Sequence, residues 1–187
     1  EGLRHGDSDP WGTHPARILT PLHGAAEPRF SHNVRMSRPS APVASSIPST
    51  RGPLSGIDVP LLVLPWFERD DPKTFGDLDR ATGGEIARAL ASREFTGKLF
   101  ELFFTPIADA AWKGRRVLLV GGGPIETFSI DLARRTATTA MLAARQRKVE
   151  RLAILLRPGA AQASGDYDTS GFAQGVAEGL TLGEFHG

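Results

Sequence analysis

The residues whose types and spacing come nearest to a chemical motif are three consecutive glycines, Gly121 to Gly123. They follow the apolar run 115–120 and precede a predicted helix, where backbone N–H groups and the helix dipole favour an anion. The spacing departs from known phosphate-binding patterns, because Glu126 stands where the dinucleotide fingerprint has its third glycine, and no Gly-Lys-Ser/Thr follows. We interpret the triplet as a tight turn between strand and helix, with a phosphate-binding loop as the alternative.

Side chains that could catalyse hydrolysis are sparse. A serine nucleophile needs a nearby base, and the only histidine of the predicted folded part is His186. Metal-dependent hydrolysis needs clustered His, Asp or Glu, yet the HExxH pattern is absent, and Asp70-Asp71 and Asp166/Asp168 fall in predicted turns. Acids in turns are typically solvated. The residues alone therefore predict no catalytic, cofactor-binding or metal-binding residue in this chain.

Aromatic and basic residues have structural interpretations too. Trp66 and Trp112 lie at strand or loop edges, where core packing is favoured over base stacking. The basic run 145–151 (RQRKVER) is typical of a solvated helix end, with cations near the negative end of the dipole. The formal net charge of +1 gives no support for a nucleic-acid partner.

The first 55 residues have the composition of a disordered tail. Proline, serine, glycine and arginine dominate, and no window keeps a helical or strand period. Such a segment buries too little apolar surface to offset the entropy of ordering it. Four of the five histidines lie here, but a disordered tail does not hold ligands around a metal. Whether residues 1–35 belong to the translated protein is an open question.

Overall composition points to a protein of the cytoplasm. Of 187 residues, 40% are hydrophobic and 23% charged, and none is cysteine, which fits a reducing compartment. No apolar run approaches the roughly 18 residues that span a membrane. The first ten residues lack the basic and apolar regions of a signal peptide.

Strands and helices are predicted to alternate after residue 57. The expected strands are 59–67, 98–107, 115–120 and 151–156, and the expected helices are 78–92, a long helix capped by Thr127 or Ser129 and ending near 148, and 171–185. This order predicts an α/β domain with a mostly parallel sheet covered on both faces.

The helix predicted over 78–92 contains an adjacent glycine pair, Gly83-Gly84. Each glycine inside a helix costs about 1 kcal/mol relative to alanine. The pair therefore indicates either close backbone packing or a special turn.

Five segments together resemble the N-terminal domain of the leucyl (cytosol) aminopeptidase family. They are DVPLLVLPWFERD (58–70), LDRATGGEIARALASREFTGK (78–98), RRVLLVGGG (115–123), ARRTATTAMLAARQRKVERLAILL (133–156) and AQGVAEGLTLGEF (173–185). The resemblance covers about 57–187 and implies a macro-like α/β domain, consistent with the order of elements read from the residues. The tail lies outside it.

The resemblance also implies where the chemistry of the family lies. A following catalytic domain holds two divalent metals, Mn or Zn, partly through the signature Asn-Thr-Asp-Ala-Glu-Gly-Arg. The single asparagine here is Asn33, followed by Val34, so the signature is absent. No catalytic or metal residue is carried over, and Gly187 lies about where the connection to the catalytic domain would begin.

Three interpretations follow. The first is a non-catalytic N-terminal domain that packs on a catalytic domain, contributes to a hexamer and shapes substrate access. Such a domain, inactive alone, is expected to self-associate through the face left uncovered. The second is a module that binds ADP-ribose or another nucleotide at Gly121–Gly123. The third is a degenerate or mis-predicted fragment of an open reading frame. No membrane partner is expected.

Overall fold

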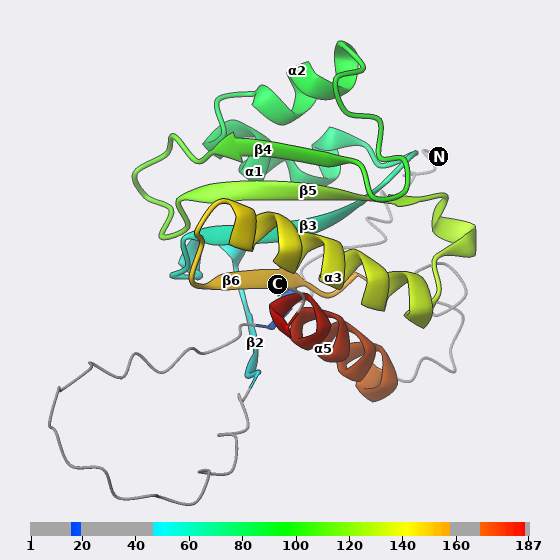
Figure 1. Cartoon of the computed structure of the whole chain (residues 1–187). Coiled ribbons are helices and arrows are strands. Elements are labelled where there is room, and N and C mark those ends of the chain that lie inside the picture. Colours follow the sequence, from blue (N-terminus) through cyan, green and yellow to red (C-terminus); the bar gives the residue numbers. More distant parts are fainter. Residues whose placement is uncertain (1–15, 20–46, 158–168, 186–187) are drawn as a thin grey trace, which may run out of the picture.

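A computed structural model describes residues 16–19, 47–157 and 169–185 of the chain. Six strands form one sheet in the order β2-β1-β6-β3-β5-β4 (Figure 1). They are β1 (Ala16–Leu19), β2 (Ser49–Gly52), β3 (Leu61–Phe67), β4 (Leu102–Pro106), β5 (Arg116–Gly123) and β6 (Leu152–Leu155). The helices are α1 (Gly76–Ala81), α2 (Glu85–Ala91), α3 (Ile130–Gln146) and α5 (Thr169–Phe185), with 3-10 turns η1 (Leu54–Gly56), η2 (Pro72–Phe75) and η3 (Ile125–Thr127).

The sheet is mixed. Its centre is parallel, because β3 pairs with β5 on one side and with β6 on the other. Antiparallel pairs flank this centre: β4 with β5, and the β1–β2 pair joined to β6 through β1. The predicted α/β class is confirmed, while the strand expected over 98–107 forms as the shorter, antiparallel β4.

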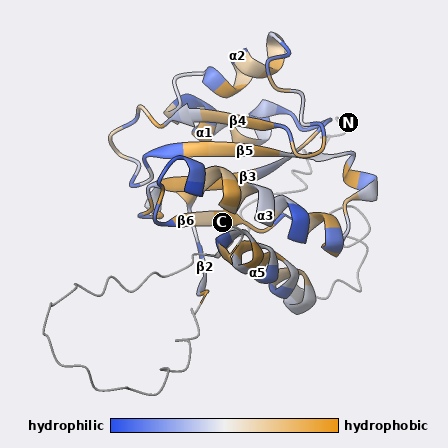
Figure 2. Ribbon diagram, viewed as in Figure 1, coloured by the Kyte–Doolittle hydropathy of each residue, from blue (hydrophilic) through white to orange (hydrophobic). Residues whose placement is uncertain are grey.

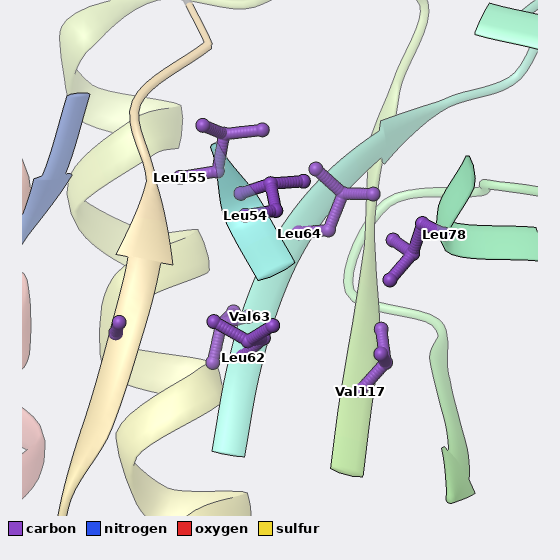
Figure 3. A pocket seen from close by; sticks show the side chains of 8 residues that line it. Leu54, Leu62, Val63, Leu64, Leu78, Val117 and Leu155 are labelled. Atoms are coloured by element: carbon purple, nitrogen blue, oxygen red, sulfur yellow. The ribbon is translucent and has the colours of Figure 1, made fainter. Parts of the chain in front are cut away.

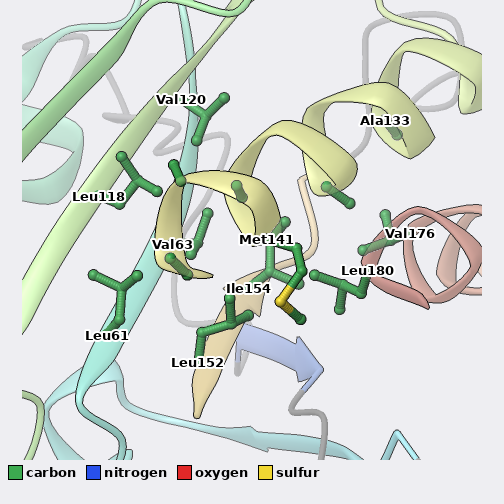
Figure 4. Packing of buried hydrophobic residues seen from close by; sticks show 14 of the residues in the cluster. Leu61, Val63, Leu118, Val120, Ala133, Met141, Leu152, Ile154, Val176 and Leu180 are labelled. Atoms are coloured by element: carbon green, nitrogen blue, oxygen red, sulfur yellow. The ribbon is translucent and has the colours of Figure 1, made fainter. Parts of the chain in front are cut away.

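The two faces of the sheet each bury a hydrophobic cluster. Successive side chains of a strand point to opposite faces, so in β5 Leu118 and Val120 join one cluster while Val117 and Leu119 join the other. The first cluster lies under α3 and α5 (Figure 4), and the second lies under α1 and α2. All seven residues of β3 are buried, as expected of a strand covered on both faces.

Helices α3 and α5 pack with their backbones unusually close. A Cβ built on Gly179 would lie 2.1 Å from the Arg134 carbonyl oxygen and 2.9 Å from Ala137 Cβ. The Thr138 hydroxyl uses this closeness to donate to the Gly179 carbonyl at 2.9 Å. The Arg134 guanidinium donates to Glu178 at 2.9 Å.

The Glu178 carboxylate is held by two donors on this contact. Hydrogen bonds from Gln174 and then from Arg134 lower the pKa of Glu178 below its usual value. Both partners keep the carboxylate charged, so this polar contact between the helices persists over the physiological pH range.

Helix α3 begins at a side-chain cap. The sequence offered both Thr127 and Ser129 as the N-terminal cap of this helix. In the structure the cap is Ser129, whose hydroxyl accepts a hydrogen bond from the Leu132 N–H at 3.3 Å. Replacing Ser129 with alanine is expected to lower the free energy of unfolding by about 1 kcal/mol. Urea denaturation measures this; Thr127→Ala is the control, because the Thr127 hydroxyl bonds only the Pro124 carbonyl before the helix. Equal losses for both variants would contradict the assignment.

The single helix predicted over 78–92 is wrong: α1 and α2 are separate. Gly83 and Gly84 both have positive φ, +73° and +82°, which glycine adopts without steric cost. The chain breaks there, and the Asp79 side chain accepts from the Ala87 N–H at 3.0 Å, in the first turn of α2. Of the two explanations offered by the sequence, the special turn is confirmed.

Two strands lie within the range 1–55 for which the sequence predicted no ordered structure. They are β1 and β2, each of four residues, paired antiparallel with Ala16 opposite Gly52. Neither carries an apolar period long enough to be recognised locally. They join the sheet through β1, which pairs with the edge that β6 offers. The remaining residues before Ile47, including the tail histidines, lie outside the described ranges.

Candidate functional site

The carboxyl ends of β3 and β6 carry an ion pair that is largely withdrawn from solvent. Such strand ends are where open α/β sheets usually form a ligand crevice. Arg157 lies just past β6 with a side chain 7% exposed, and Asp70 lies just past β3 with a side chain 12% exposed. The two form a two-pronged ion pair, Nη1 to Oδ2 and Nη2 to Oδ1.

Further contacts hold both charges. The guanidinium also donates to the Pro65 carbonyl at 2.7 Å, and it lies over the rings of Phe67 and Phe75 at 4.7 and 4.9 Å. The carboxylate accepts from the Phe67 N–H at 2.8 Å. Both oxygens of Asp70 are therefore engaged. Neither member of the pair is therefore free to act as a base or a metal ligand.

The interpretation of Asp70 as a solvated turn acid is thus wrong, and the role of Arg157 was missed. A signal existed in the sequence, because each residue follows a buried apolar run. Parallel strands bring such positions to one edge. Asp71 does sit at a turn, where its carboxylate accepts from the Lys73 N–H at 2.9 Å at the start of η2.

The glycine triplet is not a turn, so that interpretation is also wrong. Gly121 to Gly123 are the last residues of β5. Small residues are needed there because a Cβ on Gly121 would lie 1.8 Å from the Lys98 carbonyl oxygen. The Gly121 N–H donates to the backbone carbonyl of Glu101 at 2.8 Å, and the Gly123 N–H donates to the backbone carbonyl of Gly97 at 2.9 Å.

A phosphate cradle needs free backbone N–H groups, and two of these three are already used. Beyond the triplet, the Glu126 carboxylate is 58% exposed and pairs with Arg69 at 3.6 Å. This negative group stands beside the triplet and disfavours an anion. The geometry therefore removes the feature on which the nucleotide-binding interpretation depended.

The remaining candidates are placed as follows. Trp66 is fully buried and stacks near Phe75, with ring centroids 5.6 Å apart, and Trp112 is half-buried against the same cluster, so core packing is confirmed for both. In the basic run, Arg145 donates to the carbonyls of α5 and Arg147 covers the Phe104 ring at 3.6 Å. Asp166, Asp168 and His186 lie outside the described ranges.

One enclosed cavity among the described residues is too small for a ligand. The enclosed cavity shown in Figure 3 has a volume of ≈ 10 Å³ and only aliphatic walls, including Leu54, Leu62 and Val117. That is about the room for one water with no polar partner, so the cavity is expected to be dry. Two open hollows lie on the surface, one along α5 and one beside Trp112.

Among the described residues, neither hollow is lined by a set of side chains that could together catalyse a reaction. Beside Trp112, the Arg80 guanidinium is paired with Asp77, while the hollow along α5 is bordered by Glu178, itself held by Arg134. Within the described residues, no group of three or more His, Cys, Asp or Glu could hold a metal. None of the helices in the described ranges is both long and apolar enough to cross a bilayer.

Comparison with known proteins gives the fold a context. A sequence model of the N-terminal domain of the cytosol aminopeptidase family matches residues 63–187. A probable cytosol aminopeptidase from Solibacter usitatus is 30% identical over 135 residues, covering 72% of this chain and 25% of that protein. One from Cyanothece sp. is 30% identical over 125 residues, covering 65% of this chain and 24% of that protein.

A solved structure agrees in fold. A mutant of tomato leucine aminopeptidase superposes with a TM-score of 0.50 at 22% sequence identity, covering 69% of this chain and 26% of the tomato chain. The chain spans about a quarter of the length of the curated relatives it matches. The chain belongs to the cytosol aminopeptidase family and corresponds to its N-terminal domain.

Proposed function

We propose that this chain is a non-catalytic N-terminal domain that serves a leucyl aminopeptidase-type metallopeptidase, by helping its assembly and shaping substrate access. The supporting observation is the match of the family's N-terminal-domain model to residues 63–187, in a region that covers 25% of the Solibacter usitatus relative. The parent activity, release of N-terminal amino acids from peptides, would belong to the catalytic domain. We propose the cytoplasm as its location.

The metals of the family do not fit the residues described here. Divalent metals need clustered carboxylate or imidazole ligands, and Asp70, the most buried acid near the strand ends, already binds Arg157 and the Phe67 N–H. Both metals would therefore be held by a catalytic domain, and the described residues of this chain would perform no step of the chemistry.

The first test is activity of the purified chain. With leucyl-p-nitroanilide and added Mn²⁺ or Zn²⁺, we expect no release of nitroaniline above the rate with metal alone. A full-length relative assayed beside it provides the positive control. Metal-dependent turnover that scales with the concentration of the chain, and that a chelator abolishes, would overturn the proposal.

A second test addresses assembly and access. In a chimaera, the chain replaces the matching N-terminal quarter of the Solibacter usitatus relative, and a second form lacks that quarter. We expect the chimaera to assemble in light scattering and to keep metal-dependent activity, and the truncated form to lose assembly or to change its preference for peptide length. Equal assembly and equal preference in the two forms would refute the role.

Self-association of the isolated chain stays a prediction of the same proposal. Leu182 and Phe185 on α5 are 47% and 78% exposed, and Leu99 and Leu102 near β4 are similarly open. Exposed apolar side chains of this kind favour association when they are contiguous.

A further inference from the structure

One edge of the sheet gathers six exposed cations from three separate segments. We call it the basic edge; it comprises Lys113, Arg115, Arg116, Arg147, Lys148 and Arg151. The first three precede or begin β5, the next two follow α3, and the last precedes β6. In Figure 2 the start of β5 and the turn after α3 are both blue, at the same end of the sheet. The whole-chain charge of +1 conceals this concentration.

Strand register places these segments side by side. Leu61 of β3 pairs with Arg116 on one side and with Leu152 on the other. Strands lie about 4.8 Å apart, so the Cα atoms of Arg116 and Leu152 are separated by about 10 Å. This is close to the Debye length of about 8 Å at physiological salt, so the cations act together on a partner.

The basic edge is poorly neutralised by the domain itself. Three exposed acids lie nearby in the chain: Glu150 precedes Arg151, Asp109 precedes Lys113, and Asp58 precedes β3. Within the described ranges, no ion pair joins an acid to any of the six cations. The Arg147 guanidinium lies over the Phe104 ring, 3.6 Å from its centroid, and this contact favours one position of the guanidinium.

We infer that the basic edge is a docking surface for an acidic segment of another polypeptide. The inference goes beyond the proposed accessory function, which assigns no role to this edge. Four of the six cations are arginines, whose forks bind carboxylates through two hydrogen bonds. An extended acidic segment crossing the ends of β5, β3 and β6 would meet them in succession.

Carboxylates suit this surface better than a nucleic acid does. Base stacking needs an exposed aromatic ring. The nearest rings offer none, because Arg147 covers Phe104 and Trp112 is half-buried in the second hydrophobic cluster.

The test measures binding of a fluorescent peptide of alternating glutamate and glycine to the full chain by anisotropy. A labelled duplex DNA is measured in parallel at the same salt. The test variant is K113E/R115E/R151E, and the control is K73E/R93E/K98E, which changes the net charge equally at exposed cations away from this edge. Thermal melting checks that each variant is folded, and K113Q/R115Q/R151Q provides a milder form.

We expect the peptide to bind the unaltered chain, to bind less tightly as salt rises from about 50 to about 200 mM, and to bind more tightly than the DNA. The test variant should lose at least about tenfold in affinity, the milder form less, and the control little. Absence of peptide binding, equal losses in test and control variants, or tighter binding of the DNA would overturn the inference.

Discussion

Replacing Arg157 with alanine is expected to lower the free energy of unfolding by about 3–5 kcal/mol, because it leaves a buried carboxylate without its counter-charge. Asp70 is 12% exposed, and the Phe67 N–H would be its one remaining donor among the described residues. The Pro65 carbonyl would lose its partner as well. Urea denaturation followed by the fluorescence of buried Trp66 measures the effect.

Arg69→Ala is the matched control for this variant. The Arg69 side chain is 87% exposed and pairs with Glu126 at 3.6 Å, so its loss should change stability by less than about 0.5 kcal/mol. If Arg157→Ala prevents folding, Arg157→Lys keeps the charge and loses the two-pronged geometry, and it should be destabilised less. A double variant, Arg157→Met with Asp70→Leu, should recover much of the loss, because no buried charge is left unpaired.

The interpretation of this site as a structural lock depends on the contrast between these variants. If Arg157→Ala cost no more than Arg69→Ala, the pair would contribute little to stability. The stability of the strand ends would then have to come from apolar packing alone. If the double variant were as unstable as the single one, the loss would come from packing of the guanidinium on Phe67 and Phe75 rather than from the stranded charge.

Gly121→Ala is expected to have a comparable effect through steric overlap, about 3 kcal/mol or more. The added Cβ would lie 1.8 Å from the Lys98 carbonyl oxygen and 2.7 Å from its carbon, so the obstacle is backbone. That backbone cannot move freely, because Glu101 accepts from the N–H groups of Thr96 and Lys98. The Phe100 N–H in turn donates to Gly121 at 2.8 Å.

Gly52→Ala tests whether the loss is specific to close approach. No atom lies within 4 Å of a Cβ built on Gly52, and its φ is outside the left-handed region. The substitution should be neutral, or slightly stabilising through the unfolded state. Both variants are compared by thermal and urea unfolding. Equal stability of Gly121→Ala and Gly52→Ala would show that the segment 97–98 yields at little cost.

Much of the fold could be predicted from local pattern. Buried elements could be recognised where apolar residues recur along the chain. This holds for the apolar run at 61–67, the apolar stripe of α3, and Phe172, Val176 and Leu180, which are spaced four residues apart. The helix prediction at 78–92 failed because the period continues across Gly83-Gly84, while two positive φ angles turn the chain. Helix propensity alone cannot distinguish a glycine tolerated inside a helix from one that turns the chain. The turn also depends on a tertiary partner, the Asp79 side chain, which accepts a hydrogen bond from the Ala87 N–H.

The candidate site was less predictable, because its partners are distant in sequence. Asp70 and Arg157 are 87 residues apart, and each by itself resembles an ordinary surface charge next to a loop. Gly121 needs the absence of a side chain only because the segment 97–101 crosses it. The basic edge, too, comes from three segments that are separate in the chain.

The sequence by itself determined the family, the α/β class and the positions of most strands and helices, because burial period and residue order are local properties. Only the tertiary structure decided that the glycine triplet is a strand, that Asp70 and Arg157 pair at the strand ends, and that six cations share one edge. The physical reason is the order of the sheet. It sets β3 between β5 and β6, and this neighbourhood decides which distant residues share a hydrogen bond, a charge or a surface.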